Sequence, residues 1–146
     1  MKHVIIAATI VIIGASVAFA FTVNQYAGTW LNADANTRGI TRIEIRVHDS
    51  KADVRVWGKC SPQDCDWGWT PANSYADSHL TANYRSSNIV RDLTLTMTNR
   101  MTLKVRVRTQ YTDNSGRPTR GATYTFRRIL TPTGQPLKPV RRRKTR

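Results

Sequence analysis

The chain has 146 residues, enough for one domain, and 23 Lys and Arg against 9 Asp and Glu give it a formal net charge of +14. Apolar residues make up 40% of the chain and charged residues 22%, a composition that excludes a wholly disordered protein. The two cysteines are too few for a disulfide-dense scaffold or for a zinc site built of cysteine alone.

The first 20 residues have the pattern of an export signal. A weakly positive start precedes an uncharged stretch from Val4 to Ala18, and Ala18-Phe19-Ala20 supplies the small residues of a cleavage site. We therefore expect a signal peptide over 1–20 and a secreted or periplasmic mature protein. The alternative is an uncleaved anchor, because the uncharged run continues to Val23 and is then long enough to span a bilayer. The positive start lies in the cytoplasm in either case, so the rest of the chain lies outside it.

The mature chain alternates apolar and polar residues with a period of two, which is typical of β-strands. Short connections separate eight such segments, near 26–32, 40–48, 53–60, 65–70, 78–85, 88–97, 101–112 and 117–130. Strands of this kind either close into an up-and-down barrel or split into a sandwich. We predict an all-β fold over 21–130, an eight-stranded antiparallel up-and-down barrel.

Three hairpin registers follow from the requirement that both strands place their apolar residues on one face. A two-residue loop at Ser50-Lys51, a two-residue loop at Ser86-Ser87 and a three-residue loop at 98–100 satisfy it. These loops pair Val47 with Val54, Tyr84 with Ile89, and Met97 with Met101.

The first mature strand contains a short motif, Gly28-Thr29-Trp30. It resembles the Gly-x-Trp opening of the calycins, the superfamily of lipocalin and avidin-like barrels. In that superfamily a basic residue of the last strand packs over this tryptophan, a position that Arg127 or Arg128 would fill. Alternation places Arg128 on the inward face. The resemblance implies a calycin-like barrel from about 26 to 130 with a ligand cavity, and it does not name the ligand.

The segment from Trp57 to Gly68 is nearly symmetric about a four-residue turn. This turn sets Cys60 opposite Cys65, and such a pair in an exported protein favours a structural disulfide. A redox pair is the alternative, but four intervening residues do not match Cys-x-x-Cys. The same register sets each glycine of the segment opposite a tryptophan, so that an indole covers the bare backbone.

Four side chains are candidates for a ligand site inside the barrel. The register places Trp67 and Trp69 on the apolar face, where they serve either core packing or a pocket near the mouth. Arg91 shares this face, and no strand carboxylate is expected beside it. It therefore reaches water at the rim, is displaced by a bulge, or meets a carboxylate or phosphate of a ligand. With Tyr84, the predicted ligand-binding set is Trp67, Trp69, Tyr84 and Arg91.

No sequence pattern of a catalytic or metal site is present. His48 and His79, the mature histidines, have no cysteine or carboxylate at metal-ligand spacing. The sequence contains no Gly-x-Ser-x-Gly, no phosphate loop and no clear nucleophile–base pair. We therefore expect a protein that is not an enzyme and that uses no metal and no cofactor.

Outward-facing cations form the second candidate surface. The predicted register sets Arg46 opposite Arg55 and Arg42 opposite Lys59, and like charges in such positions weaken a sheet. The last nine residues contain six cations, so we expect a disordered basic tail over 131–146. All these cations serve either solubility or contact with an anionic polymer or membrane surface. The predicted contact residues are Arg42, Arg46, Arg55, Arg141, Arg142, Arg143 and Lys144.

These features together predict a non-catalytic binding protein that carries a small apolar or anionic ligand in its barrel. The alternative is a cationic, envelope- or polymer-associated protein that acts through its basic outer face and tail. Export argues against specific recognition of nucleic acid.

Overall fold

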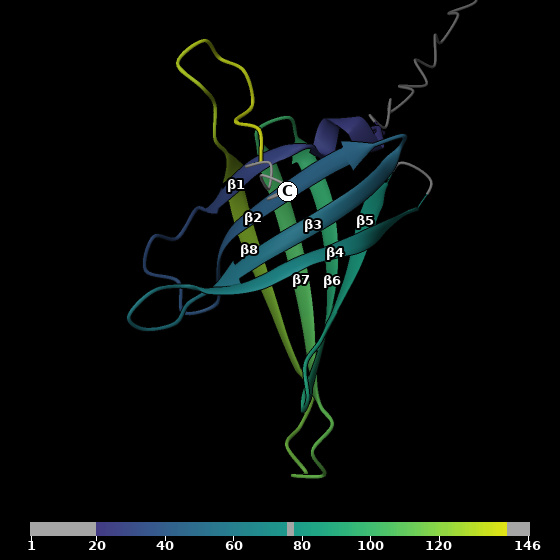
Figure 1. Cartoon of the computed structure of the whole chain (residues 1–146), viewed down its shortest axis with the longest axis vertical. Helices are drawn as coiled ribbons and strands as arrows, with labels where there is room; N and C mark the ends of the chain where they lie inside the picture. The colour runs from purple at the N-terminus through teal and green to yellow at the C-terminus, as the bar shows by residue number, and fades with distance from the viewer. Residues whose placement is uncertain (1–19, 76–77, 140–146) are drawn as a thin grey trace, which may run out of the picture.

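The structure is a computed structural model that describes residues 20–75 and 78–139, and in it the chain closes into an antiparallel barrel (Figure 1). Each strand pairs with the next, and the last pairs with the first. The predicted eight-stranded up-and-down barrel is therefore confirmed, and the sandwich is excluded. A short 3-10 helix precedes the strands, and the elements are η1 (Val23–Tyr26), β1 (Gly28–Asn32), β2 (Ile40–His48), β3 (Lys51–Gly58), β4 (Cys65–Tyr75), β5 (His79–Arg85), β6 (Ile89–Asn99), β7 (Thr102–Tyr111) and β8 (Arg120–Arg128).

Two predictions fall largely outside the described residues. The predicted signal peptide covers 1–20, of which only Ala20 is described, and the tail cations from Arg141 to Lys144 are not described. Within 20–75 and 78–139, no helix has both the length and the hydropathy needed to cross a bilayer.

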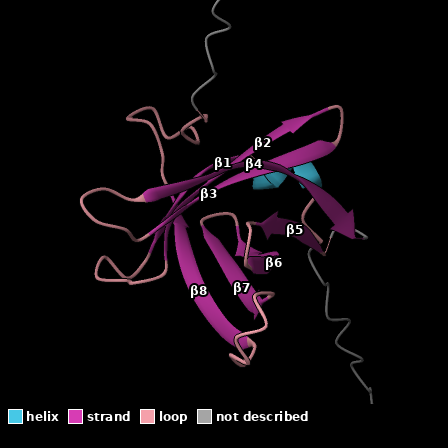
Figure 2. Ribbon diagram, turned by 60° about the horizontal axis from the view of Figure 1, so that its bottom comes forward, coloured by secondary structure: helices cyan, strands magenta, loops and turns pink. Residues whose placement is uncertain are grey.

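The helix η1 lies against the strands of the barrel (Figure 2). Apolar side chains fill the barrel at this end and pack with Val23 and Tyr26 of η1. The alternation predicted this inward face, and its central residues have at most 1% of their surface exposed. They are Trp30, Ile43, Ile45, Val54, Val56, Leu80, Leu93, Leu95, Leu103, Val105 and Phe126. Tyr26 of η1 covers this end: its backbone oxygen accepts a hydrogen bond from the Trp30 indole at 3.0 Å, and its hydroxyl donates to the Ser78 oxygen at 3.3 Å. This end of the barrel is closed.

Arg128 completes the closed end. Its guanidinium lies 4.1 Å from the centre of the Trp30 ring, and only 8% of the surface of Arg128 is exposed. It donates hydrogen bonds to the backbone oxygens of Arg100 at 2.7 Å, Ala27 at 2.6 Å, and Gln25. Of the two arginines that the sequence offered for this position, the structure places Arg128 over the tryptophan.

In three hairpins each residue lies opposite a partner two positions away from the one that the sequence predicted. His48 pairs with Lys51 around a loop of Asp49 and Ser50, both with positive φ. Farther on, Tyr84 pairs with Arg91 and Met97 with Leu103. Because side chains alternate with a period of two, a shift of two residues leaves every side chain on its predicted face. The shift does change the cross-strand partners.

The new partners remove the like-charge pairs that the sequence predicted on the outer face. Arg46 lies opposite Asp53, with 3.0 Å between Nε and the carboxylate, and Arg42 lies opposite Trp57. Arg55 lies opposite Glu44. The predicted pairs Arg46–Arg55 and Arg42–Lys59 are therefore wrong, and the outer face of β2 and β3 pairs opposite charges instead.

An irregularity in the β3–β4 pairing moves the side chain of one tryptophan from the inner to the outer face of the barrel. Trp57 lies opposite Asp66, whereas Arg55 lies opposite Trp69, so β4 contains one extra residue between these two pairs. Gly68 lies in this interval with a φ of 81°, in the left-handed region that favours glycine. Trp67 keeps its predicted inward position, but Trp69 lies on the outer face beside Arg55. The predicted inward placement of Trp69 is wrong.

The disulfide between Cys60 and Cys65 is confirmed, with 5.4 Å between the Cα atoms. The strand register beside it differs from the prediction, since Gly58 lies opposite Cys65 rather than Trp67. The Trp67 ring nevertheless covers Gly58, where a Cβ atom would approach the indole to 3.0 Å. The predicted cover of a glycine by an aromatic ring is therefore present in another register.

The chain after β8 folds back along β1. The Leu137 amide donates to the Ile129 oxygen at 2.9 Å, and the Thr29 hydroxyl donates to the Leu137 oxygen at 3.2 Å. Residues 131–139, which the sequence assigned to a disordered tail, thus form a turn held against the closed end.

Candidate ligand-binding site

The barrel is hollow at the end opposite η1. A cavity of about 540 Å³ lies there, between the ends of β2, β3, β4, β6, β7 and β8. The loops 33–39, 59–64 and 112–119 all lie at this end, which we call the mouth (Figure 1). The lining residues are Arg38, Gly39, Ile40, Gly58, Lys59, Cys60, Cys65, Trp67, Arg91, Val107, Thr109, Tyr111, Arg120, Gly121, Ala122 and Tyr124.

Trp67 and Tyr84 separate the cavity from the filled half of the barrel. Their ring centres are 5.5 Å apart and the rings meet edge to face at 71°. The Tyr84 hydroxyl donates to the Val54 oxygen at 2.7 Å, and burial raises the pKa of Tyr84. Tyr84 is 8% exposed and does not line the cavity. It therefore supports Trp67 from beneath.

Arg91 lies directly over Trp67, with 4.5 Å between the guanidinium carbon and the ring centre. It pairs with Tyr84 on one side and Thr109 on the other, so it shares their inward face. No residue in the described part of the chain forms an ion pair with it. The structure thus brings together three of the four predicted ligand residues and leaves out Trp69.

Three further cations line the cavity, and none of them was among the predicted ligand residues. Arg38 comes from the β1–β2 loop, Lys59 follows β3, and Arg120 begins β8. Each flanks or occupies a connection, and in an up-and-down barrel every second connection lies at the same end. This rule could have identified them as neighbours before the structure was known.

The charge of the cavity wall is strongly one-sided. Its described lining contains Arg38, Lys59, Arg91 and Arg120 and no carboxylate. Lys59 is partly neutralised, because its Nζ lies 3.6 Å from Asp64. The other three cations make no ion pair with any described residue. The wall is therefore an electropositive site with an aromatic and aliphatic lining.

Two tyrosines form part of the wall near the rim. The Tyr124 ring lies so close to Gly39 that a Cβ there would approach the hydroxyl to 2.1 Å. Arg117 covers the Tyr111 ring at 3.9 Å and is itself paired with Asp113. Hydrogen bonds from Ser115 and Arg117 hold the pKa of Asp113 at about 2, so this pair stays charged.

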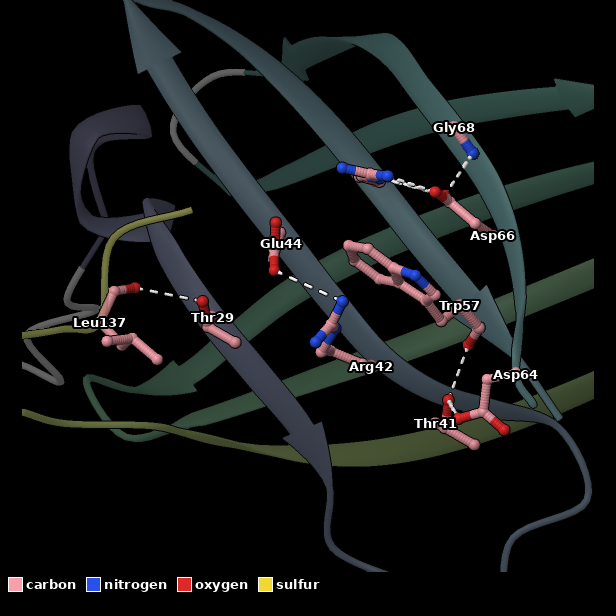
Figure 3. A network of polar contacts seen from close by, with 10 residues as sticks. Thr29, Thr41, Arg42, Glu44, Trp57, Asp64, Asp66, Gly68 and Leu137 are labelled. Atoms are coloured by element: carbon pink, nitrogen blue, oxygen red, sulfur yellow. Dashed lines mark hydrogen bonds and ion pairs between the residues drawn. The ribbon is translucent and has the colours of Figure 1, made fainter. Parts of the chain in front are cut away.

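Arg42, Arg46 and Arg55, the described outer cations that the sequence offered for anionic contact, form a separate network on β2, β3 and β4. Figure 3 shows part of it, with Arg42, Glu44, Trp57 and Asp66 labelled. Arg42 lies over Trp57 at 3.7 Å and Arg46 over Trp69 at 4.3 Å, with Arg55 between the two rings. Each arginine also has an acidic neighbour: Glu44 for Arg42, Asp53 for Arg46 and Asp66 for Arg55. The network is charge-balanced, which weakens its attraction for an external anion.

Two carboxylates of this network have opposite pKa shifts. Asp66 accepts hydrogen bonds from Arg55 and from the Gly68 amide, and these lower its pKa. Burial raises the pKa of Glu44, which is 4% exposed and has one oxygen, Oε2, without a hydrogen-bond partner. Arg42 opposes this rise from 3.8 Å. These shifts belong to the barrel wall rather than to the cavity.

Within residues 20–75 and 78–139, no three His, Cys, Asp or Glu side chains lie close enough together to hold a metal ion. No protein family, curated protein or solved structure matches the chain. Function is therefore inferred from the geometry of the mouth.

Proposed function

We propose that the protein is a non-catalytic binding protein whose barrel mouth takes a small ligand with an apolar body and an anionic group. The observation that supports this most directly is the cavity wall, where four cations meet on an aromatic and aliphatic lining without a carboxylate. A buried or half-buried guanidinium without a protein anion gains most from an anion supplied from outside.

The size of the cavity fits such a ligand. Small-molecule sites have volumes of about 300–1,000 Å³ and are mostly apolar with a few polar anchors. The cavity of about 540 Å³ lies within this range. Because Trp67 and Tyr84 close its floor, the ligand enters only the outer half of the barrel.

We also propose that the barrel is calycin-like and that the chain is exported. The packing of Arg128 over Trp30 is the arrangement implied by the Gly-x-Trp resemblance. The Cys60–Cys65 disulfide is typical of proteins from oxidising compartments. Both points support a carrier outside the cytoplasm.

Replacement of Arg91 tests the proposal. Decanoate and decanol, which share an apolar chain and differ in charge, compete with a fluorescent anionic probe such as anilinonaphthalene sulfonate. We expect Arg91→Met to weaken decanoate binding by about tenfold or more and to leave decanol little changed, because a tenfold loss corresponds to one charge-assisted contact. Arg106→Met is the matched control, since Arg106 is exposed on the outer face of β7.

Arg91→Met should leave the free energy of unfolding unchanged or raise it, because an unpaired cation on an apolar face is costly. The proposal is overturned if the wild type binds neither compound, or if Arg91→Met and Arg106→Met bind decanoate as tightly as the wild type.

A further inference from the structure

The closed end of the molecule has a groove of its own, with a volume of about 990 Å³. It lies between η1 with the start of β1 on one side and the C-terminal segment 130–139 on the other. Figure 1 shows η1 and this segment at one end of the molecule, with the 112–119 loop at the other. The groove and the ligand cavity therefore face in different directions.

Three exposed apolar side chains meet in the groove. Met101 lies in the β6–β7 turn, and Leu130 and Leu137 lie on the segment after β8. They have 40%, 40% and 42% of their surface exposed, and they come from parts of the chain far apart in sequence. A gathered apolar patch of this kind, bordered by polar residues, marks a contact surface.

The border of this patch is positively charged. Arg100 and Lys138 line the groove, and no described carboxylate does. Arg128 also lines it, but its guanidinium is engaged with three backbone oxygens. The described chain ends at Pro139 in the groove wall, and five more cations follow within the next seven residues of the sequence. Arg100 and Lys138 therefore place positive charge beside the exposed apolar side chains.

We propose that this closed end docks on an anionic phospholipid surface, with Met101, Leu130 and Leu137 inserted at the boundary between headgroups and acyl chains. Cations are attracted to an anionic membrane surface, and apolar side chains gain free energy by leaving water. An anionic polysaccharide or nucleic acid would use the cations but offers no apolar interior for the three side chains. The ligand mouth stays open to solvent in this orientation.

Sedimentation with lipid vesicles tests the proposal. The test uses the chain from Phe21 to Arg146, the mature protein expected after cleavage of the signal peptide. This chain contains the whole barrel and the whole groove. We expect it to bind vesicles of phosphatidylcholine mixed with phosphatidylglycerol more tightly than vesicles of phosphatidylcholine alone. We expect Met101→Ser, Leu130→Ser and Leu137→Ser together to weaken that binding by about tenfold or more, because three apolar contacts are lost.

The matched control replaces equally exposed apolar residues elsewhere, Leu31→Ser and Tyr75→Ser, which are 41% and 49% exposed in the wild type. This variant should bind the mixed vesicles as the wild type does. The single variant Leu130→Ser should show a smaller loss in the same direction and covers the case in which the triple variant fails to fold. Equal binding by groove and control variants, or binding to heparin or single-stranded DNA without binding to vesicles, would overturn the proposal.

Discussion

Glu44 is a carboxylate enclosed in the outer surface of the barrel wall. Arg42 lies 3.8 Å from it and Arg55 lies opposite it on β3, yet Oε2 lacks a hydrogen-bond partner. Burial therefore dominates over attraction, and the pKa of Glu44 rises. A group whose folded pKa lies above its unfolded value stabilises the fold most when it is protonated. Its contribution is full below about pH 4.5 and is lost as the pH rises through the folded pKa.

We predict that Glu44→Gln raises the free energy of unfolding at pH 7 by a few tenths of a kcal/mol to about 1 kcal/mol, because the amide resembles the protonated carboxyl. The difference from the wild type should shrink as the pH falls towards 4.5. Chemical denaturation at several pH values measures both effects. Asp66→Asn is the opposite control and should destabilise the fold at pH 7, because the pKa of Asp66 is lowered by its bonds to Arg55 and Gly68.

Arg128 holds the closed end through its geometry as well as its charge. Its guanidinium stacks on Trp30 and donates to three backbone oxygens, two at η1 and one in the β6–β7 turn. We predict that Arg128→Met lowers the free energy of unfolding by about 3 kcal/mol, since the buried oxygens lose their donors. Arg128→Lys should recover only part of this loss, because an ammonium group lacks the planar fork. Arg127→Met, at an exposed neighbouring position, should change stability by less than about 0.5 kcal/mol in the same denaturation experiment.

At the scale of the strands, the sequence predicted the faces better than the partners. Apolar alternation alone assigned Ile43, Ile45, Leu93 and Leu95 to the interior, and the structure buries them. The turn centres were misplaced by one residue, which shifts the cross-strand pairing by two: the first hairpin turns at Asp49-Ser50, with two positive φ values, rather than at Ser50-Lys51. The alternation could not reveal this error, because a shift of two residues preserves each face.

A shift of one residue has the opposite effect and could not be predicted. The extra residue at Gly68 turns Trp69 outwards, where Arg46 and Arg55 cover it. The sequence offered the same glycine as a partner for a tryptophan, so its role in a bulge was hidden. This single residue places Trp69 in the outer network, apart from Trp67, Tyr84 and Arg91, which lie together at the inner end of the cavity.

The disulfide hairpin is the element whose stability is easiest to test. Removal of the bond frees a loop of only a few residues, for which chain entropy predicts a loss of about 2 kcal/mol. We therefore predict that Cys60→Ser, and likewise Cys60→Ser with Cys65→Ser, lowers the free energy of unfolding by this modest amount. Both cysteines line the mouth, so decanoate affinity should fall as well. A folded, exported wild-type protein with two freely reacting thiols would contradict the prediction.

The molecule as a whole has two unlike ends on one barrel wall. One end is filled and capped by η1, Trp30 and Arg128, and the other holds an electropositive cavity. The sequence could not decide between a filled and a hollow barrel, because both use the same alternation. In the structure one half of the barrel is filled and the other half is hollow. The proposed ligand site and the proposed membrane-facing groove therefore lie at opposite ends of the barrel.

The basic tail should act on the whole molecule through charge rather than through a fixed contact. A chain that ends at Leu137 lacks the six C-terminal cations and keeps a formal charge of +7 between residues 21 and 137. We predict that it binds anionic vesicles more weakly than the longer chain at low salt, at about 1 kcal/mol for each cation near the surface. The two chains should bind more alike as the salt rises to 1 M, because the Debye length falls from about 10 Å at 0.1 M to about 3 Å.

The salt series also separates the tail from the groove. Apolar contacts of Met101, Leu130 and Leu137 do not depend on screening, so the binding that remains at high salt should be lost in the serine variant and kept by the shortened chain. Vesicle sedimentation of the three chains across the series measures this. Binding that is equal for full-length and shortened chains at low salt would show that the tail serves only solubility, and no residual binding at high salt would assign the whole attraction to charge.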